Sequence, residues 1–203
     1  MDRRTQILRA AARRIARDGV RGLRVTDVAE EADVSPGLLY YHFTDRAGLL
    51  SATLDYINAH ANDVRARRAD AGLSAFAKLE QQLLSEIDDD TEVRENSAAW
   101  NELRALAVFE TELREPLRRT TSAWIQEVAR SVAAVQIDDG TAATSDSTRT
   151  ATILTALVEG LANRWLAGEL TVEEAHGLLS EATARLVHLR PNPSSPPRLK
   201  ETS

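Results

Sequence analysis

The chain has 203 residues, a net charge of −6 at pH 7 and no cysteine. Its length fits one large domain or two modest ones. Without cysteine, the sequence excludes a disulfide framework, a thiolate metal site and a cysteine nucleophile. Arginines are interleaved through the N-terminal segment, and no apolar run approaches the roughly 18 residues of a membrane span. We therefore expect a cytoplasmic protein that makes no membrane contact.

Charge is distributed unevenly along the chain. Residues 1–50 carry nine arginines against seven acidic residues, whereas the rest of the chain carries 16 basic against 24 acidic residues. The overall acidity excludes a protein that coats nucleic acid through basic charge everywhere. A small DNA-facing segment attached to an acidic body fits the asymmetry, because phosphate attraction is needed only at the contact surface.

The N-terminal region predicts a helix followed by a shorter one. Apolar residues recur at spacings of three and four from about Asp2 to Asp18, and Gly19 follows where a helix end favours positive φ. Thr26 then stands at an N-cap position, and we expect it to begin a second helix of about two turns.

A third and a fourth helix are predicted next. Serine is a good N-cap and proline fits the first helical position, so Ser35 and Pro36 predict a short helix that reaches about residue 43. Asp45 is expected to cap a longer helix that ends near Arg67.

The remainder of the chain continues the helical pattern. Helices are predicted near residues 74–87, 91–109, 115–135, 147–167 and 172–189. The polar segment 138–147 predicts a mobile loop, and the proline-rich end predicts a disordered tail. We therefore predict an all-α protein of about nine helices, with a DNA-binding domain at 1–46, a helical ligand-binding and dimerisation domain at 47–190 and a tail at 191–203.

The second and third helices match a helix-turn-helix, in which the second helix enters the major groove and the first crosses the backbone. The small residues Ala29, Ala32 and Gly37 should let the two helices approach closely. Tyr40 and Phe43, at i and i+3, are expected to pack inward, although DNA contact is the alternative for both. Arg3 and Arg4 form either a flexible arm along the groove or a solvated first turn.

At this point the sequence resembles the TetR family of bacterial regulators. The matching residues are Ile7, Leu8, Ala11, Ala12, Gly19, Thr26, Val28, Ala29, Ala32, Val34, Ser35, Gly37, Leu39, Tyr40, His42, Phe43, Leu49 and Leu50. The resemblance implies a homodimer that binds a palindromic operator with its first three helices and is released by a small-molecule effector held in the larger helical domain. The resemblance implies no cofactor and no metal ion. Whether the protein represses or activates transcription is not readable from the residues.

Residue roles follow from that resemblance position by position. It implies contacts to the DNA backbone from Thr26, Tyr41, His42 and Arg46, and contacts in the groove from Ser35, Pro36, Gly37 and Leu38. These residue types suit the task, because hydroxyls, an imidazole and a guanidinium all bind phosphate. Arg46 departs from the lysine that the family usually has, and a phosphate contact survives that exchange.

The C-terminal half resembles, more loosely, the subgroup of the choline–betaine regulator, through residues 100–106, 113–116 and 156–161. A ligand pocket needs apolar walls with a few polar groups. The candidate ligand-binding residues are His60, Trp100, Asn101, Arg104, Trp124, Glu159 and Asn163. For each of them the alternative is an ordinary core or solvated position.

The last two predicted helices carry a wide apolar stripe. Its members are Leu154, Leu157, Val158, Leu161, Trp165, Leu178, Leu179, Ala182 and Leu186. Such a stripe is wide for the surface of a monomer, so we expect these residues to form the dimer interface, with internal core as the alternative.

Enzymatic motifs are absent from the sequence. The four histidines have no i, i+4 pairing, and no zinc-protease, nucleophile-elbow or phosphate-loop pattern occurs. His176 with Glu173 and Glu174 is better explained as a solvated helix face than as a metal site. The sequence predicts a regulator and not an enzyme, while a helical scaffold protein and a helical enzyme remain the competing classes.

Overall fold

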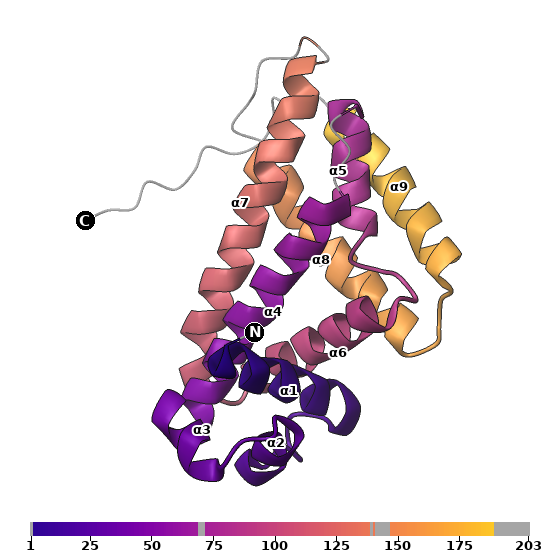
Figure 1. The fold of residues 1–203 in the computed structure, drawn as a ribbon. Coiled ribbons are helices and arrows are strands. Elements are labelled where there is room, and N and C mark those ends of the chain that lie inside the picture. The colour runs from indigo at the N-terminus through magenta and orange to yellow at the C-terminus, as the bar shows by residue number, and fades with distance from the viewer. Residues whose placement is uncertain (1, 69–71, 139, 141–146, 189–203) are drawn as a thin grey trace, which may run out of the picture.

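The computed structural model describes residues 2–68, 72–138, 140 and 147–188. The predicted tail at 191–203 lies outside the described residues, as does most of the predicted loop at 138–147. Within the described part, the chain forms α-helices and one 3₁₀ turn and contains no strand (Figure 1). The helices are α1 (Arg3–Asp18), α2 (Val25–Glu31), α3 (Pro36–His42), α4 (Arg46–Arg68), α5 (Ala75–Leu84), α6 (Thr91–Leu106), α7 (Arg114–Asp138), α8 (Ser147–Leu166) and α9 (Val172–His188), with the 3₁₀ turn η1 at Thr111–Leu113. The predicted all-α class is confirmed, and these nine α-helices lie close to the ranges expected.

Side-chain caps explain several helix starts. The Ser35 hydroxyl accepts from the Leu38 amide at 3.2 Å, and the Asp45 carboxylate accepts from the Gly48 amide at 2.7 Å. Both predicted caps are confirmed, and each satisfies an amide that has no partner within the helix.

The start of α2 differs from the prediction. The amide of Val28 donates to the carbonyl of Arg24, which makes Arg24 the N-cap and places Thr26 inside the first turn. The Thr26 side chain is exposed, and its hydroxyl lies 3.4 Å from an Asp27 carboxylate oxygen. The predicted N-cap at Thr26 is therefore wrong, because α2 already begins at Val25, one residue earlier, with Arg24 as its N-cap.

The turn between α2 and α3 is tight because Asp33 adopts φ 50°, a left-handed conformation that aspartate tolerates. Ala29 and Ala32 are fully buried there, as close helix packing requires. Gly37, however, is exposed, and a Cβ on it would meet nothing closer than the Ser35 hydroxyl at 3.9 Å. The prediction that Gly37 permits close approach of the two helices is wrong.

The long helices connect the two ends of the molecule. Figure 1 shows α1, α2 and α3 gathered at one end, with α4 and α7 running from there toward the other, where α5, α8 and α9 lie. Helix α6 packs on α1 and reaches α8 as well. The N-terminal helices are thus joined to the body through α4 and α6.

Two hydrophobic cores fill the molecule. The first contains the apolar faces of α1, α2 and α3 together with Leu49 and Leu50 of α4 and Leu103 of α6. The second joins α5, α7, α8 and α9 around residues such as Leu83 and Val128. The first core therefore continues past residue 46, the expected end of the DNA-binding domain, because α4 and α6 cover the apolar faces of the N-terminal helices.

The stripe predicted as a dimer interface is mostly internal. Five of its members are buried within the single chain and belong to the second core: Leu154, Val158, Leu161, Trp165 and Leu179. The prediction is wrong for these five, because they are buried in the second core of the same chain and do not reach the surface. Leu157, Ala182 and Leu186 are half-buried, and Leu178 is 48 % exposed. These four remain available at the surface.

Candidate DNA-binding helix and ligand cavity

Helix α3 presents a mostly exposed face. Tyr41 is 82 % exposed and Tyr40 53 %, while Phe43 is only 4 % exposed. Inward packing is therefore confirmed for Phe43 and wrong for Tyr40. Leu39 takes the inward position instead, because residues 39 and 43 are four apart and share one side of the chain.

The other predicted DNA contacts lie around these tyrosines. Ser35, Pro36 and Gly37 are exposed, whereas Leu38 and His42 are half-buried. The rings of Tyr41 and His42 meet edge to face with centroids 5.3 Å apart. Helix α3 carries no acidic residue, so nothing on it repels phosphate.

An arginine that was not assigned to the site from the sequence joins this surface. Arg4 lies in the first turn of α1, with its guanidinium carbon 5.4 Å from the centre of the Phe43 ring, just past the end of α3. Arg3 is also in that turn, where it donates to the Gln6 side chain at 3.0 Å. The two residues form the solvated helical turn and not the flexible arm.

Three acidic residues of α1 and α2 form ion pairs with arginines of α1. Arg14 forms ion pairs with Asp18 at 3.2 Å and Asp27 at 3.0 Å, and Arg17 pairs with Glu31 at 3.1 Å. The positive charge of Arg4 is therefore less opposed than the near-balanced composition of the region suggests.

Arg46, expected at a phosphate, is engaged within the chain. Its Nη2 donates to the carbonyl of Val20 at 2.8 Å, and its Nη1 lies 3.4 Å from Glu110 Oε1. The side chain thus ties the start of α4 to the turn after α1 and to the segment after α6.

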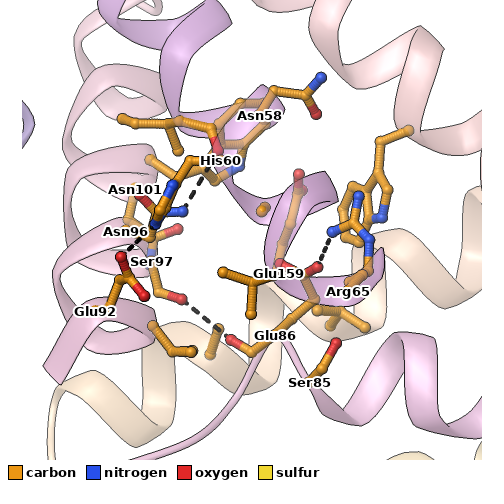
Figure 2. Close-up of a pocket in the computed structure, with 18 residues that line it drawn as sticks. Asn58, His60, Arg65, Ser85, Glu86, Glu92, Asn96, Ser97, Asn101 and Glu159 are labelled. Carbon is orange, nitrogen blue, oxygen red and sulfur yellow. Dashed lines mark hydrogen bonds and ion pairs between the residues drawn. The ribbon is translucent and has the colours of Figure 1, made fainter. Parts of the chain in front are cut away.

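A cavity opens at the junction of the two cores (Figure 2). Helices α4 and α6 of the first core line it on one side, and Trp124, Val158 and Ala162 of the second core line it on the other. It encloses about 770 Å³ of empty space, its open mouth included. The cavity therefore suits a small ligand.

Most of the predicted ligand residues line this cavity. Those that do are His60, Trp100, Asn101, Trp124 and Glu159. Arg104 stands beside the lining and forms an ion pair with Glu159 at 2.9 Å. Asn163 is exposed and donates to the backbone carbonyl of Glu159 at 3.2 Å, so its predicted place in the cavity is wrong.

Several polar lining residues were missed from the sequence: Asn58, Arg65, Ser85, Glu86, Glu92, Asn96 and Ser97. Part of this set has a sequence signal, because Glu92 and Asn96 precede Trp100 by eight and four residues and so share its helix face. Glu86 lies after the end of α5, where no periodicity could have placed it.

Ion pairs hold the polar lining. Arg65 pairs with Glu86 and, at 3.2 Å, with Glu127, as Figure 2 shows for the first of these pairs. His60 Nε2 lies 2.7 Å from Glu92 Oε1, and the ring of His60 stacks on Tyr56 with centroids 5.8 Å apart. Three carboxylates and one guanidinium therefore line the cavity, and a second guanidinium, that of Arg104, lies beside it, so the carboxylates outnumber the arginines.

Burial raises the pKa of two of these carboxyl groups. Removal from water raises the pKa of Glu159, against the opposing effects of Arg104 and a hydrogen bond from Trp100. Burial likewise raises the pKa of Glu86, and Arg65 opposes the rise. A cation bound beside either group would stabilise its charged form and lower its pKa.

Besides Arg65, whose Nε is also unpartnered, three lining residues present buried polar atoms that have no hydrogen-bond partner among the described residues. They are the indole Nε1 of Trp124, the amide Nδ2 of Asn101 and the carboxylate Oε1 of Glu159. An unpartnered buried polar atom costs about 1–3 kcal/mol. A ligand that offers both a donor and an acceptor would recover that cost.

Other possible sites are weak. Among the described residues, no group of three histidine, aspartate or glutamate side chains is placed to hold a metal ion. His176 Nε2 lies 2.7 Å from the carbonyl of Ile87 and 3.1 Å from that of Leu84, which attaches α9 to the end of α5. No helix in the described ranges is long and apolar enough to cross a membrane.

Comparison with known families matches both parts of the chain. Residues 7–53 match the family model of the bacterial regulatory proteins of the TetR family, and residues 75–188 match that of the BetI-type transcriptional repressor C-terminal domain. The chain therefore belongs to the TetR family, with a C-terminal domain of BetI type. It is a DNA-binding transcriptional regulator, and ligand-responsive repression is typical of its family. Members of the family are generally not enzymes.

Individual relatives and solved structures are similar to the chain over most of its length. A crystal structure described as a TetR-family transcriptional regulator from Rhodococcus sp. is 51 % identical, with a TM-score of 0.85, covering 91 % of this chain and 98 % of that one. The regulator BetI of Burkholderia mallei (strain NCTC 10229) is 28 % identical over 177 residues, 84 % of each chain. The structure of a transcriptional regulator from Saccharomonospora viridis in complex with choline is 24 % identical, with a TM-score of 0.75, over 88 % of this chain and 93 % of that one.

Proposed function

We propose that the protein is a repressor that binds a palindromic operator as a homodimer and is released when a small cationic ligand enters the cavity between the two cores. The observation that carries this proposal is the position of the cavity, which is lined by the two helices that also cover the N-terminal helices. A bacterial repressor of this kind would act in the cytoplasm, where the DNA lies.

The DNA contacts are proposed for the exposed face of α3 and its surroundings. Tyr41 and His42 would bind phosphate, and Ser35 to Leu38 would face the groove. Gly37 supports this reading, because an exposed glycine in a helix has no internal reason to lack a side chain and leaves room for the DNA. Thr26, in the first turn of α2, is also proposed to contact a phosphate.

A dimer would place two copies of α3 about one turn of DNA apart or somewhat more. The outer faces of α8 and α9 support the pairing, since Ile153 is 43 % exposed and Leu178 48 %. Gly160 lies on the same side of α8 as Ile153, seven residues on, and a Cβ there would meet nothing within 4 Å. Small residues on both helices would let the partners approach closely.

The ligand class follows from the lining. Three carboxylates, two tryptophans and aliphatic walls suit a small cation with an apolar body. The regulator from Saccharomonospora viridis was crystallised with choline, a small cation of this kind, which makes choline a suitable probe.

Helix α4 is the proposed lever, since it begins at the N-terminal helices and lines the cavity from Ile57 to Arg65. A ligand can release DNA only if it binds one spacing of the α3 helices better than the other. A coupling of about 1–3 kcal/mol is the expected scale.

The test uses operator DNA selected from a random pool by the wild-type protein. Fluorescence anisotropy should show binding by the wild type, a loss of about tenfold or more in Tyr41→Ala and Gly37→Ala, and release of the wild type by choline. Gly37→Ala is the sharper variant, because alanine is the better helix former by about 1 kcal/mol and the fold should gain stability while DNA affinity falls. Failure of the wild type to select any sequence would sink the repressor proposal. If both variants keep the DNA affinity of the wild type, the DNA contacts must come from residues outside α3.

A further inference from the structure

We propose that Arg46, Glu102 and Glu110 form a clamp on the backbone of Val20, and that this clamp fixes the angle at which the DNA-binding helices are held on the body. Arg46 is then a positioning residue and not a phosphate contact. The inference deepens the proposed function, on which its DNA measurements rest, while its amide-exchange measurement does not depend on DNA.

Val20 lies in the turn between α1 and α2 and is only 2 % exposed. Its amide donates to the carboxylate Oε2 of Glu102 in α6 at 2.9 Å. Its carbonyl accepts from Nη2 of Arg46 in α4 at 2.8 Å, and also from the Leu23 amide at 3.3 Å. Helices α4 and α6 therefore hold both polar backbone groups of one buried residue, each through a charged side chain, and such hydrogen bonds are the stronger kind.

The residue before Val20 is shaped for this contact. Gly19 has φ 75°, and a Cβ on it would lie 3.3 Å from the same Glu102 oxygen. A side chain there would be strained by the backbone and crowded by the carboxylate. The turn thus brings its backbone close to Glu102.

Arg46 is itself held by the segment that follows α6. Its Nη1 lies 3.4 and 3.5 Å from the two carboxylate oxygens of Glu110, whose amide donates to the carbonyl of Leu106 at the end of that helix. The guanidinium therefore connects the first residue of α4, the segment after α6 and the turn after α1. Binding a phosphate would compete with these contacts.

Both helices that reach the clamp also line the cavity. Asn101, a lining residue, is the neighbour of Glu102 along α6, and Ile57 lies three turns beyond Arg46 along α4. A ligand that moves either helix would move a part of the clamp. Because the clamp grips the backbone of the DNA-binding end, its position would set the distance between the two α3 helices of a dimer.

The first measurement is hydrogen exchange of the Val20 amide in the free, full-length protein. Glu102→Ala removes the acceptor, and the exchange rate of this amide should rise about tenfold. Glu102→Gln keeps a carbonyl oxygen and should preserve most of the protection. Unchanged protection in Glu102→Ala would overturn the clamp. Glu102 is an exposed side chain, so both variants are expected to fold.

The second measurement compares operators whose half-site spacing is changed by one base pair. The wild type should lose about tenfold in affinity on the altered spacing, whereas Arg46→Gln and Glu102→Ala should lose markedly less. Arg46→Lys, a milder change that keeps the charge but lacks the planar fork, should show an intermediate loss. The matched control is Arg118→Gln, which breaks an exposed arginine–glutamate pair of 2.9 Å on α7 and should discriminate between spacings as the wild type does.

The salt dependence of operator binding separates the clamp from a phosphate contact. If Arg46 is a positioning residue, the slope of log affinity against log salt in Arg46→Gln equals that of the wild type. A slope smaller by about one per subunit would make Arg46 a phosphate contact and overturn the proposal. If the wild type binds no DNA, the repressor proposal fails, and the Val20 exchange rate still decides whether the clamp exists.

Discussion

The DNA-binding surface and the ligand cavity are built in opposite ways. The exposed face of α3 comes from a run of nine neighbouring residues, 35–43, held by a serine cap and by inward packing of Leu39 and Phe43. The cavity takes its lining from α4, α6, α7, α8 and the segment after α5, which are far apart in the sequence. Local structure is thus enough to form the first site, whereas the second exists only where two cores meet.

The largest effect is expected from Gly160→Arg, which tests whether both sites depend on a dimer. The variant chain should fold, because a Cβ at position 160 meets nothing within 4 Å. The arginine would, however, place a bulky charge in the proposed interface of α8 and α9. Sedimentation analysis should show monomers. Operator affinity should fall by about a hundredfold or more, since two linked half-site contacts become one.

The control for that variant is Ala105→Arg, which adds the same charge to an exposed position of α6. It should remain dimeric. A dimeric Gly160→Arg protein would place the interface elsewhere and leave the outer faces of α8 and α9 without this role.

A smaller effect is expected from alanine substitutions that test the two hydrophobic cores one at a time. Leu103 in α6 and Leu83 in α5 are both fully buried, the first in the core of the N-terminal helices and the second in the core of the body. Either alanine substitution should lower the free energy of unfolding by about 2–5 kcal/mol in urea titrations. Leu103→Ala should also speed amide exchange in α1 and α4, while Leu83→Ala should speed it in α5, α7 and α9. Identical exchange patterns would mean that the two cores open as one unit.

The smallest effect concerns the cavity and its pH dependence. Burial raises the pKa of Glu159, and only the ionised carboxylate attracts a cation. Choline binding should therefore weaken as pH falls through that raised pKa, above the ordinary value of 4.5, and should release protons in that pH range. Glu159→Gln should weaken choline binding about tenfold at pH 7 and abolish the proton release, as measured by calorimetry in buffers of different ionisation heat.

Asn163→Ala is the matched control, because Asn163 lies on the same helix but outside the cavity. It should bind choline as the wild type does. Equal binding by wild type and Glu159→Gln would remove this carboxylate from the ligand site.

The sequence by itself determined the helices, most of their caps and the helix-turn-helix, because periodicity, Ser35, Pro36 and Asp45 act within a few residues of chain. Prediction from the sequence failed at positions whose conformation depends on contacts with neighbouring residues. Tyr40 turned outward because Leu39 fills the one inward position on α3, and α2 began before Thr26 because the Arg24 carbonyl accepts its first hydrogen bonds.

Only the tertiary structure decided which apolar and charged residues meet. An apolar stripe has the same periodicity whether it faces another chain or its own core, and burial in the second core is what placed Leu154 and Leu179 inside the chain. Similarly, an arginine after an aspartate cap suits phosphate or a carbonyl equally well. The approach of Val20 and Glu110, residues 26 and 64 positions away, is what placed Arg46 between them.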